Sequence, residues 1–409
     1  MKFSIVLVIV FAALGMCSCN SGGKNIDIEE DSTAVVIDSA NALRFELVTP
    51  DVHFPVELKQ SPDTTHRLFI TDVNGKIAIV KAGIMLPQPF LDISNKLETR
   101  DSAPNVRCMY SMVFHPQFAK NGKFYVCYNA PTHIDTNVAK LVVSEFTVSK
   151  TNPNVADPLS ERRVFELEGH TVQNDPCEMA FGPDGDLYIS IGDNGTPMKD
   201  RKGEDLNSYL GKLIRIDVRQ FPYTIPADNP FVGKGNAKPE IWAYGLRRFW
   251  RFSFDTVSHT LIGADVGDKL QEEVDVITKG GNYGWPIMEG DSQRVKTDSA
   301  KAAAFVAPIA TYSRKEGICV MGGAIYRGKG MPYMQGRYLF ADLNGNVFAL
   351  TKNAQGKWDR KQLTVLNKPA SPFIINSCNV DNIGEIYLMG TLNTNAGSKG
   401  VVYRLAKAF

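Results

Sequence analysis

The sequence lacks the features that mark several classes of protein. Its 409 residues carry a formal net charge of only +1, and no stretch is strongly basic. We therefore expect no nucleic-acid partner. There is no C-x-x-C-H motif, the pattern of covalent c-type haem, and the cysteine spacings are not those of a zinc site. Long helical periodicity is scarce whereas glycine and proline are frequent, and this balance favours an all-β fold.

The N-terminus has the pattern of an export signal. Met1-Lys2 precedes an apolar run, residues 3–16, that is too short to span a membrane. The small Ser18 before Cys19 resembles a bacterial lipoprotein processing site. We therefore expect residues 1–18 to be a lipoprotein signal peptide and Cys19 to carry the lipid; an ordinary signal peptide cut nearby is the alternative. Residues 19–42 are polar and acidic and are predicted to be a flexible tether, which makes the protein an exported, membrane-anchored lipoprotein.

A degenerate strand pattern recurs from residue 43 to residue 409. A glycine follows a polar residue, then comes a strand with an aromatic, then Asp or Gly, as in GKFYVCYN, GDLYISIGD, GRYLFADLNG and GEIYLMG. An irregular spacing of roughly 40–70 residues is typical of propeller blades. The count is about six blades, so the sequence predicts an all-β, six-bladed β-propeller. Val401–Leu405 is expected to complete a blade begun near Phe45 and so to close the ring.

The stretch from residue 240 to residue 290 indicates one edge of a binding face. Three glycines surround Asn282 and Tyr283, which suits positive φ or a close approach of the backbone. Arg247 and Arg248 stand just before a strand and could contact an anion or form salt bridges. Nearby aromatics, Tyr283 and Trp285, could stack on a sugar or pack in the core.

Seven longer motifs follow one another along the chain. They are VFHPQF (113–118) with the NGKFYV that follows it, FGPDGDLYISIGDNG (181–195), EDLNSYLGKLIRID (204–217), YTIPADNPFVG (223–233), EIWAYGLR (240–247), EEVDVITKGGNYGWP (272–286) and GGAIYRG (322–328). Together they resemble the glucose/sorbosone dehydrogenase family, the soluble quinoprotein sugar dehydrogenases. The likeness covers residues 43–409, and the family fold, a six-bladed propeller, agrees with the blade count.

The resemblance implies oxidation of a sugar at a carbon that bears a hydroxyl. Family members use pyrroloquinoline quinone (PQQ) and calcium, with a histidine as the base. By resemblance, Arg247, Arg248, Asn194 and Asn344 are the candidates to hold the cofactor, although Arg248 and Asn344 stand where the family has asparagine and lysine. The calcium loop aligns with Gly267 and Asp268, where a backbone carbonyl and a carboxylate suit a hard cation.

The chain departs from the family pattern at the catalytic position. The family histidine corresponds to Asn174, and asparagine cannot act as a base. His170 lies four residues earlier, and Asp193 stands in the IGDNG turn. We therefore expect Asn174, His170 and Asp193 to face the reacting substrate. The arginines expected around residues 377–382 are missing, and each lost charge-assisted contact removes about 1.5–3 kcal/mol from binding of a tri-carboxylate cofactor.

Four cysteines are predicted to ring the mouth of the channel. Cys108, Cys177, Cys319 and Cys378 each begin an innermost-strand pattern. Because export permits disulfides, one hypothesis pairs Cys108 with Cys177 and Cys319 with Cys378. A soft-metal site with Met109, Met179 and Met321, or buried free thiols, are the alternatives. Cys127, inside a strand, is expected to be free and buried.

Two functional hypotheses remain, with a third behind them. The first is an oxidoreductase that acts on a sugar or related alcohol with calcium and PQQ. The second is a non-catalytic surface lipoprotein that binds a glycan or a protein in the same funnel. A hydrolase or lyase using Asp or Glu is the third, because a fold does not fix a function. The expected partners are a small sugar or glycan and, through the lipid, a membrane.

Overall fold

The computed structural model describes residues 41–97, 108–132, 138–171, 177–195, 201–298, 304–394 and 397–408. Two compact units are distinguished, residues 1–37 and residues 38–409, and all described residues belong to the second. The predicted signal peptide, Cys19, the tether up to residue 40, and Asn174 lie outside the described residues. What the sequence predicts for them stays a prediction.

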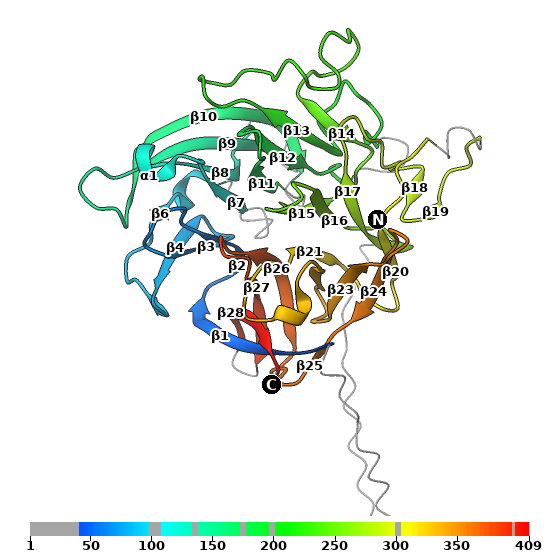
Figure 1. Ribbon diagram of the computed structural model, residues 1–409. Coiled ribbons are helices and arrows are strands. Elements are labelled where there is room, and N and C mark those ends of the chain that lie inside the picture. The colour runs from blue at the N-terminus through cyan, green and yellow to red at the C-terminus, as the bar shows by residue number, and fades with distance from the viewer. Residues whose placement is uncertain are drawn as a thin grey trace, which may run out of the picture. The chain divides into compact units, whose positions relative to one another are not determined.

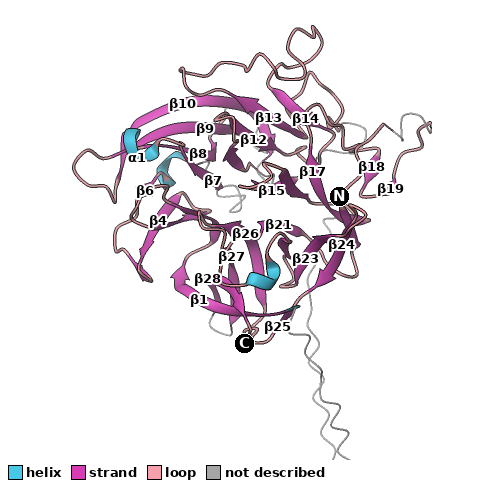
Figure 2. Ribbon diagram, in the orientation of Figure 1, coloured by secondary structure: helices cyan, strands magenta, loops and turns pink. Residues whose placement is uncertain are grey.

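The second unit is a ring of six antiparallel sheets, the blades of a β-propeller (Figure 1 and Figure 2). In each blade the first of its strands in the following list is the inner one, which faces the centre of the ring. Blade 1 holds β2 (Pro55–Gln60), β3 (Leu68–Asp72), β4 (Lys76–Lys81), β5 (Ile84–Met85) and β6 (Leu91–Asp92); blade 2 holds β7 (Met109–Phe114), β8 (Lys123–Ala130), β9 (Val138–Val148) and β10 (Ala156–Thr171); blade 3 holds β11 (Met179–Phe181), β12 (Leu187–Ile191), β13 (Lys212–Ile216) and β14 (Ile241–Tyr244).

The other three blades follow the same plan, and the last one closes the ring. Blade 4 holds β15 (Phe249–Phe254), β16 (Leu261–Asp265), β17 (Gln271–Ile277) and β20 (Ala310–Ser313); blade 5 holds β21 (Val320–Ile325), β22 (Tyr338–Asp342), β23 (Val347–Lys352) and β24 (Trp358–Gln362); blade 6 holds β26 (Phe373–Val380), β27 (Ile386–Thr394), β28 (Gly397–Lys407), β1 (Ala42–Val52) and β25 (Thr364–Val365). The N-terminal strand β1 pairs with the C-terminal strand β28, with Phe45 opposite Leu405. The predicted six-bladed ring and its closure are confirmed, and pairing the two ends removes an open sheet edge.

Most inner and middle strands are buried along their whole length. Every residue of β12, β13 and β22 is buried. The reason is that each sheet packs between two neighbouring blades, so both of its faces are covered. Strands of this kind have nearly continuous apolar sequences, which made them easy to predict. Packing is tight enough that a Cβ on Gly323 of β21 would lie 1.9 Å from the carbonyl oxygen of Leu339 in β22.

The outermost strand of blade 2 was not predicted. β10 is 16 residues long and is the longest of the described strands. Its sequence, ADPLSERRVFELEGHT, is rich in charges because only one edge of it pairs, with β9. The helices are short: α1 (Phe118–Asn121) and two 3-10 turns, Ser94–Lys96 and Pro332–Met334. None of the helices in the described part of the chain is long and apolar enough to cross a membrane.

Candidate functional site

A cavity of about 330 Å³ lies on the axis of the propeller. Inner strands of five blades form its wall, through Val56 of β2, Met109 of β7, Trp250 of β15, Met321 of β21 and Ile374 of β26. The mouth of a closed ring is where propellers place their ligand sites. Twelve of the fifteen lining residues are aliphatic, aromatic or sulfur-containing, and the other three are Arg248, Arg251 and Asn376.

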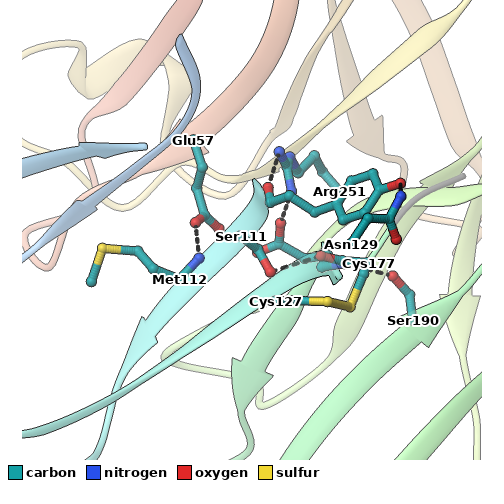
Figure 3. Close-up of a disulfide and its surroundings, with 10 residues drawn as sticks. Glu57, Ser111, Met112, Cys127, Asn129, Cys177, Ser190 and Arg251 are labelled. Atoms are coloured by element: carbon teal, nitrogen blue, oxygen red, sulfur yellow. Dashed lines mark hydrogen bonds and ion pairs between the residues drawn. A yellow bond between two sulfur atoms is a disulfide. The ribbon is translucent and has the colours of Figure 1, made fainter. Parts of the chain in front are cut away.

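Arg251 is the residue that connects the blades at the axis. Its guanidinium forms an ion pair with Glu178, which precedes β11 in blade 3 (Figure 3). It also donates to Ser377 Oγ of blade 6 at 3.1 Å, to the carbonyl oxygen of Tyr110 of blade 2 at 3.0 Å, and to the carbonyl oxygen of Val56 of blade 1. A single side chain of blade 4 therefore contacts four other blades, and we call its surroundings the axial network.

Two further charges complete the axial network. Lys59 Nζ lies 3.0 Å from Glu57 and 2.8 Å from Glu178. Burial and the charge of Glu178 raise the pKa of Glu57 to about 8. Burial alone would also raise the pKa of Glu178, but Lys59 and Arg251 hold that pKa below its usual value. The two cations thus keep Glu178 ionised, while Glu57 retains its proton near neutral pH.

The structure corrects the predicted cysteine pairing. The disulfide joins Cys127 of β8 to Cys177, and Cys108, Cys319 and Cys378 are free thiols (Figure 3). Cys127 was expected to be free, but alternation along β8 turns it toward blade 3, where it packs in the same core cluster as Cys177. Cys108 and Cys319 instead line the axial cavity, and burial raises the pKa of the Cys108 thiol to about 12.

The predicted calcium loop is occupied by arginine side chains. Arg247 Nη1 donates to the carbonyl oxygens of Val266 and Gly267 at 2.8 and 2.7 Å, and Arg314 Nη2 also donates to Gly267 O, at 2.6 Å. The carboxylate of Asp268 accepts from Arg247 at 3.1 Å and from Arg294 at 2.8 Å. Three guanidinium groups therefore take the oxygens expected to bind the ion, and we call this arrangement the arginine clamp.

Buried acidic residues hold the arginine clamp in place. Glu272 forms an ion pair with Arg314, and burial raises the pKa of Glu272 to about 7. Glu289, on the β18–β19 hairpin (Met288–Glu289 and Ser292–Gln293), lies 3.0 Å from Arg294. Glu289 also accepts backbone N–H groups across residues 268–271. These contacts fix both the loop and the arginines that fill it.

Trp285 forms the floor of the arginine clamp. Its ring centroid lies 5.2 Å from the guanidinium carbon of Arg201, 5.3 Å from that of Arg247 and 5.0 Å from that of Arg294. Its indole N–H donates to Asp193, which also pairs with Arg201. Trp285 is 2% exposed and Tyr283 is 5% exposed. Both rings therefore pack in the interior, as the core alternative predicted, and do not form a platform for stacking a sugar.

The structure brings only some of the predicted site residues together. Asp193, Arg247, Gly267 and Asp268 form one connected group, since the N–H of Asp193 donates to the carbonyl oxygen of Arg247 at 2.9 Å. Arg248 lines the axial cavity. Asn174 lies outside the described residues.

The remaining predicted residues lie around or outside this group. His170 is buried at the end of β10, with its ring centroid 6.2 Å from that of Tyr110. Asn194 donates to the carbonyl oxygen of Gly169 at 2.8 Å. Asn344 is exposed in the β22–β23 turn and donates to the carbonyl oxygen of Glu316 at 3.2 Å.

Blade 4 contains a second buried charged centre, made of carboxylates. Oxygens of Asp265, Glu273 and Asp275 lie within 4.8 Å of one another, a spacing that could hold a metal ion. Asp265 accepts the backbone N–H groups of Arg247 and Arg248 at 2.8 and 2.6 Å. Neither oxygen of Asp275 has a hydrogen-bond partner among the described residues. Burial raises the pKa of Asp265 to about 7 and raises those of Glu273 and Asp275 well above the usual range.

The donor groups at the mouth do not fit calcium and PQQ. Calcium takes 6–8 oxygen ligands, as a rule, whereas the oxygens of Gly267 and Asp268 already accept from three guanidinium groups. A tri-carboxylate cofactor needs several cations. Of the two arginines in the cavity wall, Arg251 is already paired with Glu178.

Several functional residues were not predicted from the sequence. Glu57, Lys59, Arg251, Arg294 and Arg314 build the axial network and the arginine clamp. The available signal was a charged residue at an inward position of an apolar strand, as in FWRFSF around Arg251 and PVELKQ around Glu57. Such residues are rarely buried without a partner, so they point to an interior ion pair.

Comparison with known proteins relates most of the propeller to one family. The sequence profile described as Glucose / Sorbosone dehydrogenase matches residues 52–372. The chain is 31% identical over 355 residues to the HIPL1 protein of Arabidopsis thaliana, covering 70% of this chain and 50% of that protein. It is 28% identical over 373 residues to the Hedgehog-interacting protein of Mus musculus, covering 86% of this chain and 50% of that protein. The chain thus spans half the length of these curated relatives.

A solved structure agrees with the architecture. The PQQ-bound form of aldose sugar dehydrogenase from Streptomyces coelicolor superposes with a TM-score of 0.67, covering 89% of this chain and 98% of that chain. The sequence identity is 17%. At that identity the likeness concerns the fold alone, and it matches the closed ring of six blades.

Proposed function

This chain belongs to the glucose/sorbosone dehydrogenase family, and we propose that it uses the family propeller to bind a small ligand in the axial cavity without quinone-dependent oxidation. The loop that would take calcium is closed by its own arginines. The wall of the cavity is mostly apolar. The position of the family's catalytic base holds Asn174, which cannot accept a proton at neutral pH.

The arginine clamp is the observation that carries this proposal. A positively charged guanidinium on the carbonyl oxygen of Gly267 repels a calcium ion at the same place. Moving the arginines aside would leave Asp268, Glu272 and Glu289 without their cations. Breaking buried pairs of this kind costs about 3–5 kcal/mol each, which a calcium ion would have to offset.

Calorimetric titration of the purified protein with PQQ, with and without calcium, tests the proposal. We expect no binding heat at high micromolar quinone and no dye reduction with glucose or other sugars. A calcium-loaded quinoprotein glucose dehydrogenase serves as the positive control for both assays. Saturable quinone binding that depends on calcium would overturn the proposal.

Oxidation of a sugar or related alcohol is the second candidate. The family profile over residues 52–372 favours it, and PQQ-bound relatives of the same fold exist. This candidate requires the arginine clamp to open when quinone and calcium arrive. Calcium-dependent quinone binding followed by sugar-dependent dye reduction would support it.

We also propose that the propeller is exported and attached to a membrane through Cys19. The basis is the sequence pattern of residues 1–19. Mass spectrometry of the N-terminal peptide tests this point, and a diacylglyceryl group on Cys19 is the expected result. A Cys19→Ala variant that fractionates with membranes as the natural protein does would contradict it.

A further inference from the structure

The wall of the axial cavity does not suit a sugar. Sugars carry a hydroxyl on almost every carbon, and a hydroxyl placed against an apolar wall loses its hydrogen bonds with water without replacement. The wall presents Phe54, Met109, Trp250, Met321 and Ile374. The polar group nearest in character to a sugar partner, Asn376, already donates to the carbonyl oxygen of Pro55 at 3.4 Å. The body of a ligand that fills this space is therefore apolar.

The charges of the wall are all of one sign. Arg248 and Arg251 are the ionisable basic residues of the lining, and no Asp or Glu lines the cavity among the described residues. Arg251 is neutralised by its ion pair with Glu178. Arg248 is held at the wall by its own backbone, because its N–H donates to Asp265 at 2.6 Å. A terminal nitrogen of its guanidinium lies 3.1 Å from where a Cβ on Gly195 would stand, so the glycine leaves room for it.

The positive charge of Arg248 has an electrostatic cost in the folded protein. Burial and the neighbouring charge of Arg248 together lower the pKa of Arg247. An anion beside Arg248 would reduce this repulsion. It would also gain the strength of a charge-assisted hydrogen bond in a site of low polarity.

We propose that the axial cavity binds a monoanionic amphiphile, a carboxylate with an apolar body. The carboxylate contacts Arg248, and the apolar body lies among Met109, Trp250, Met321 and Ile374. A volume of about 330 Å³ admits a single small molecule of this kind. This inference rests on the proposed function, because it names the ligand class of the same cavity.

Binding of decanoate, measured by calorimetry and by the shift of the melting temperature, tests the inference. Decanol and glucose are the matched probes, since one lacks the charge and the other lacks the apolar body. We expect saturable decanoate binding, decanol binding about 10- to 100-fold weaker, and no glucose binding.

Variants locate the site and its charge. Arg248→Gln should weaken decanoate binding about 10- to 100-fold and leave decanol unchanged, whereas Arg248→Lys should retain most of the affinity. Leu343→Trp fills the cavity and should abolish binding of both probes. Arg44→Gln, on the outer strand β1, is the control and should change nothing. Circular dichroism checks that each variant is folded.

Each contrary result has a distinct meaning. Equal affinity for decanol and decanoate, or decanoate binding that survives Arg248→Gln, would overturn the role of the charge. Unchanged binding by folded Leu343→Trp would overturn the location. No decanoate binding at all would overturn the inference while the proposed function stands, because only calcium-dependent quinone binding rejects the latter.

Discussion

Two buried charged centres in this propeller are neutralised in opposite ways. The axial network sets two cations, Lys59 and Arg251, against two carboxylates, Glu57 and Glu178. The carboxylate cluster of blade 4 gathers Asp265, Glu273 and Asp275, and no lysine or arginine side chain in the described part of the chain forms an ion pair with any of them. The first centre is stabilised by opposite charges, and the second must hold protons or a cation.

This difference separates structural rigidity from pH sensitivity. An ion pair between blades fixes their arrangement and tolerates a wide pH range, because the arginine stays charged. Carboxylates that keep protons only through burial lose them as the pH rises, and their mutual repulsion then acts on the fold. We therefore expect the axis to determine stability at neutral pH and blade 4 to determine how stability changes with pH.

Removal of the central cation should give the largest effect. Arg251→Met leaves Glu178 buried with Lys59 as its one remaining cation and disconnects four blades. We expect the free energy of unfolding to fall by about 3–5 kcal/mol, measured by urea denaturation at neutral pH. Arg404→Met, which breaks an exposed pair with Glu46, is the control and should cost less than about 1 kcal/mol. Equal losses for the two variants would show that the axial network is not a special centre.

The stability of the natural protein should fall as the pH rises from about 4 to about 8. The pKa of Asp265 is raised to about 7, and those of Glu273 and Asp275 are raised further above the unfolded values. The native state therefore holds protons that the unfolded chain has released. This stabilisation is complete below the unfolded pKa and is lost as the pH passes the folded pKa.

Asp275→Asn isolates the share of blade 4 in that slope. The variant should be more stable than the natural protein at about pH 8.5, by roughly 1–3 kcal/mol, and close to it at about pH 4. Denaturation curves across this range measure the effect. A variant with the same pH slope as the natural protein would contradict the assignment.

Glu57→Gln should have a smaller effect and sharpen the contrast. Burial and Glu178 raise the pKa of Glu57 to about 8, so this carboxyl is mostly protonated at neutral pH. Glutamine resembles the protonated form, and we expect a change of less than about 1 kcal/mol near neutral pH. A loss as large as that of Arg251→Met would mean that Glu57 is ionised and belongs to the ion-pair network in full.

Calcium should have the smallest effect. A saturating ligand at a hundredfold excess over its Kd stabilises a protein by about 2.7 kcal/mol. With the arginine clamp closed and protons on the carboxylate cluster, we expect neither calcium nor a chelator to change the melting temperature measurably. A strong stabilisation by calcium that Asp275→Asn abolishes would show that a cation, not protons, neutralises blade 4.

Local sequence patterns were sufficient for the architecture. Lys76–Lys81 and Tyr338–Asp342 were predicted with the bounds that the structure has. Pairing of the last strand with the first was also predicted, because a propeller with free edges is unstable. The charged strand β10 was missed because its sequence reflects an outer position instead of an alternating apolar face.

Site prediction failed where the partner of a residue is far away in the sequence. Gly267 and Asp268 were correctly identified as a loop of available oxygens, but their partner Arg314 follows Gly267 by 47 positions and belongs to the connection between blades 4 and 5. The disulfide was predicted at Cys177 with the wrong partner, Cys108. Both cysteines border blade 2, and only the side on which a strand presents its side chain separates Cys108 from Cys127.

The sequence by itself determined the all-β class, the number of blades and the closure of the ring, because apolar alternation, turn residues and family motifs are local. The tertiary structure alone decided which charges meet. Arg251 reaches Glu178 across 73 positions, and Cys127 reaches Cys177 across 50. Such pairs depend on how neighbouring blades pack against each other, and that packing sets the direction of each buried side chain. The chemistry of the axial cavity therefore follows from the assembled ring and not from any single blade.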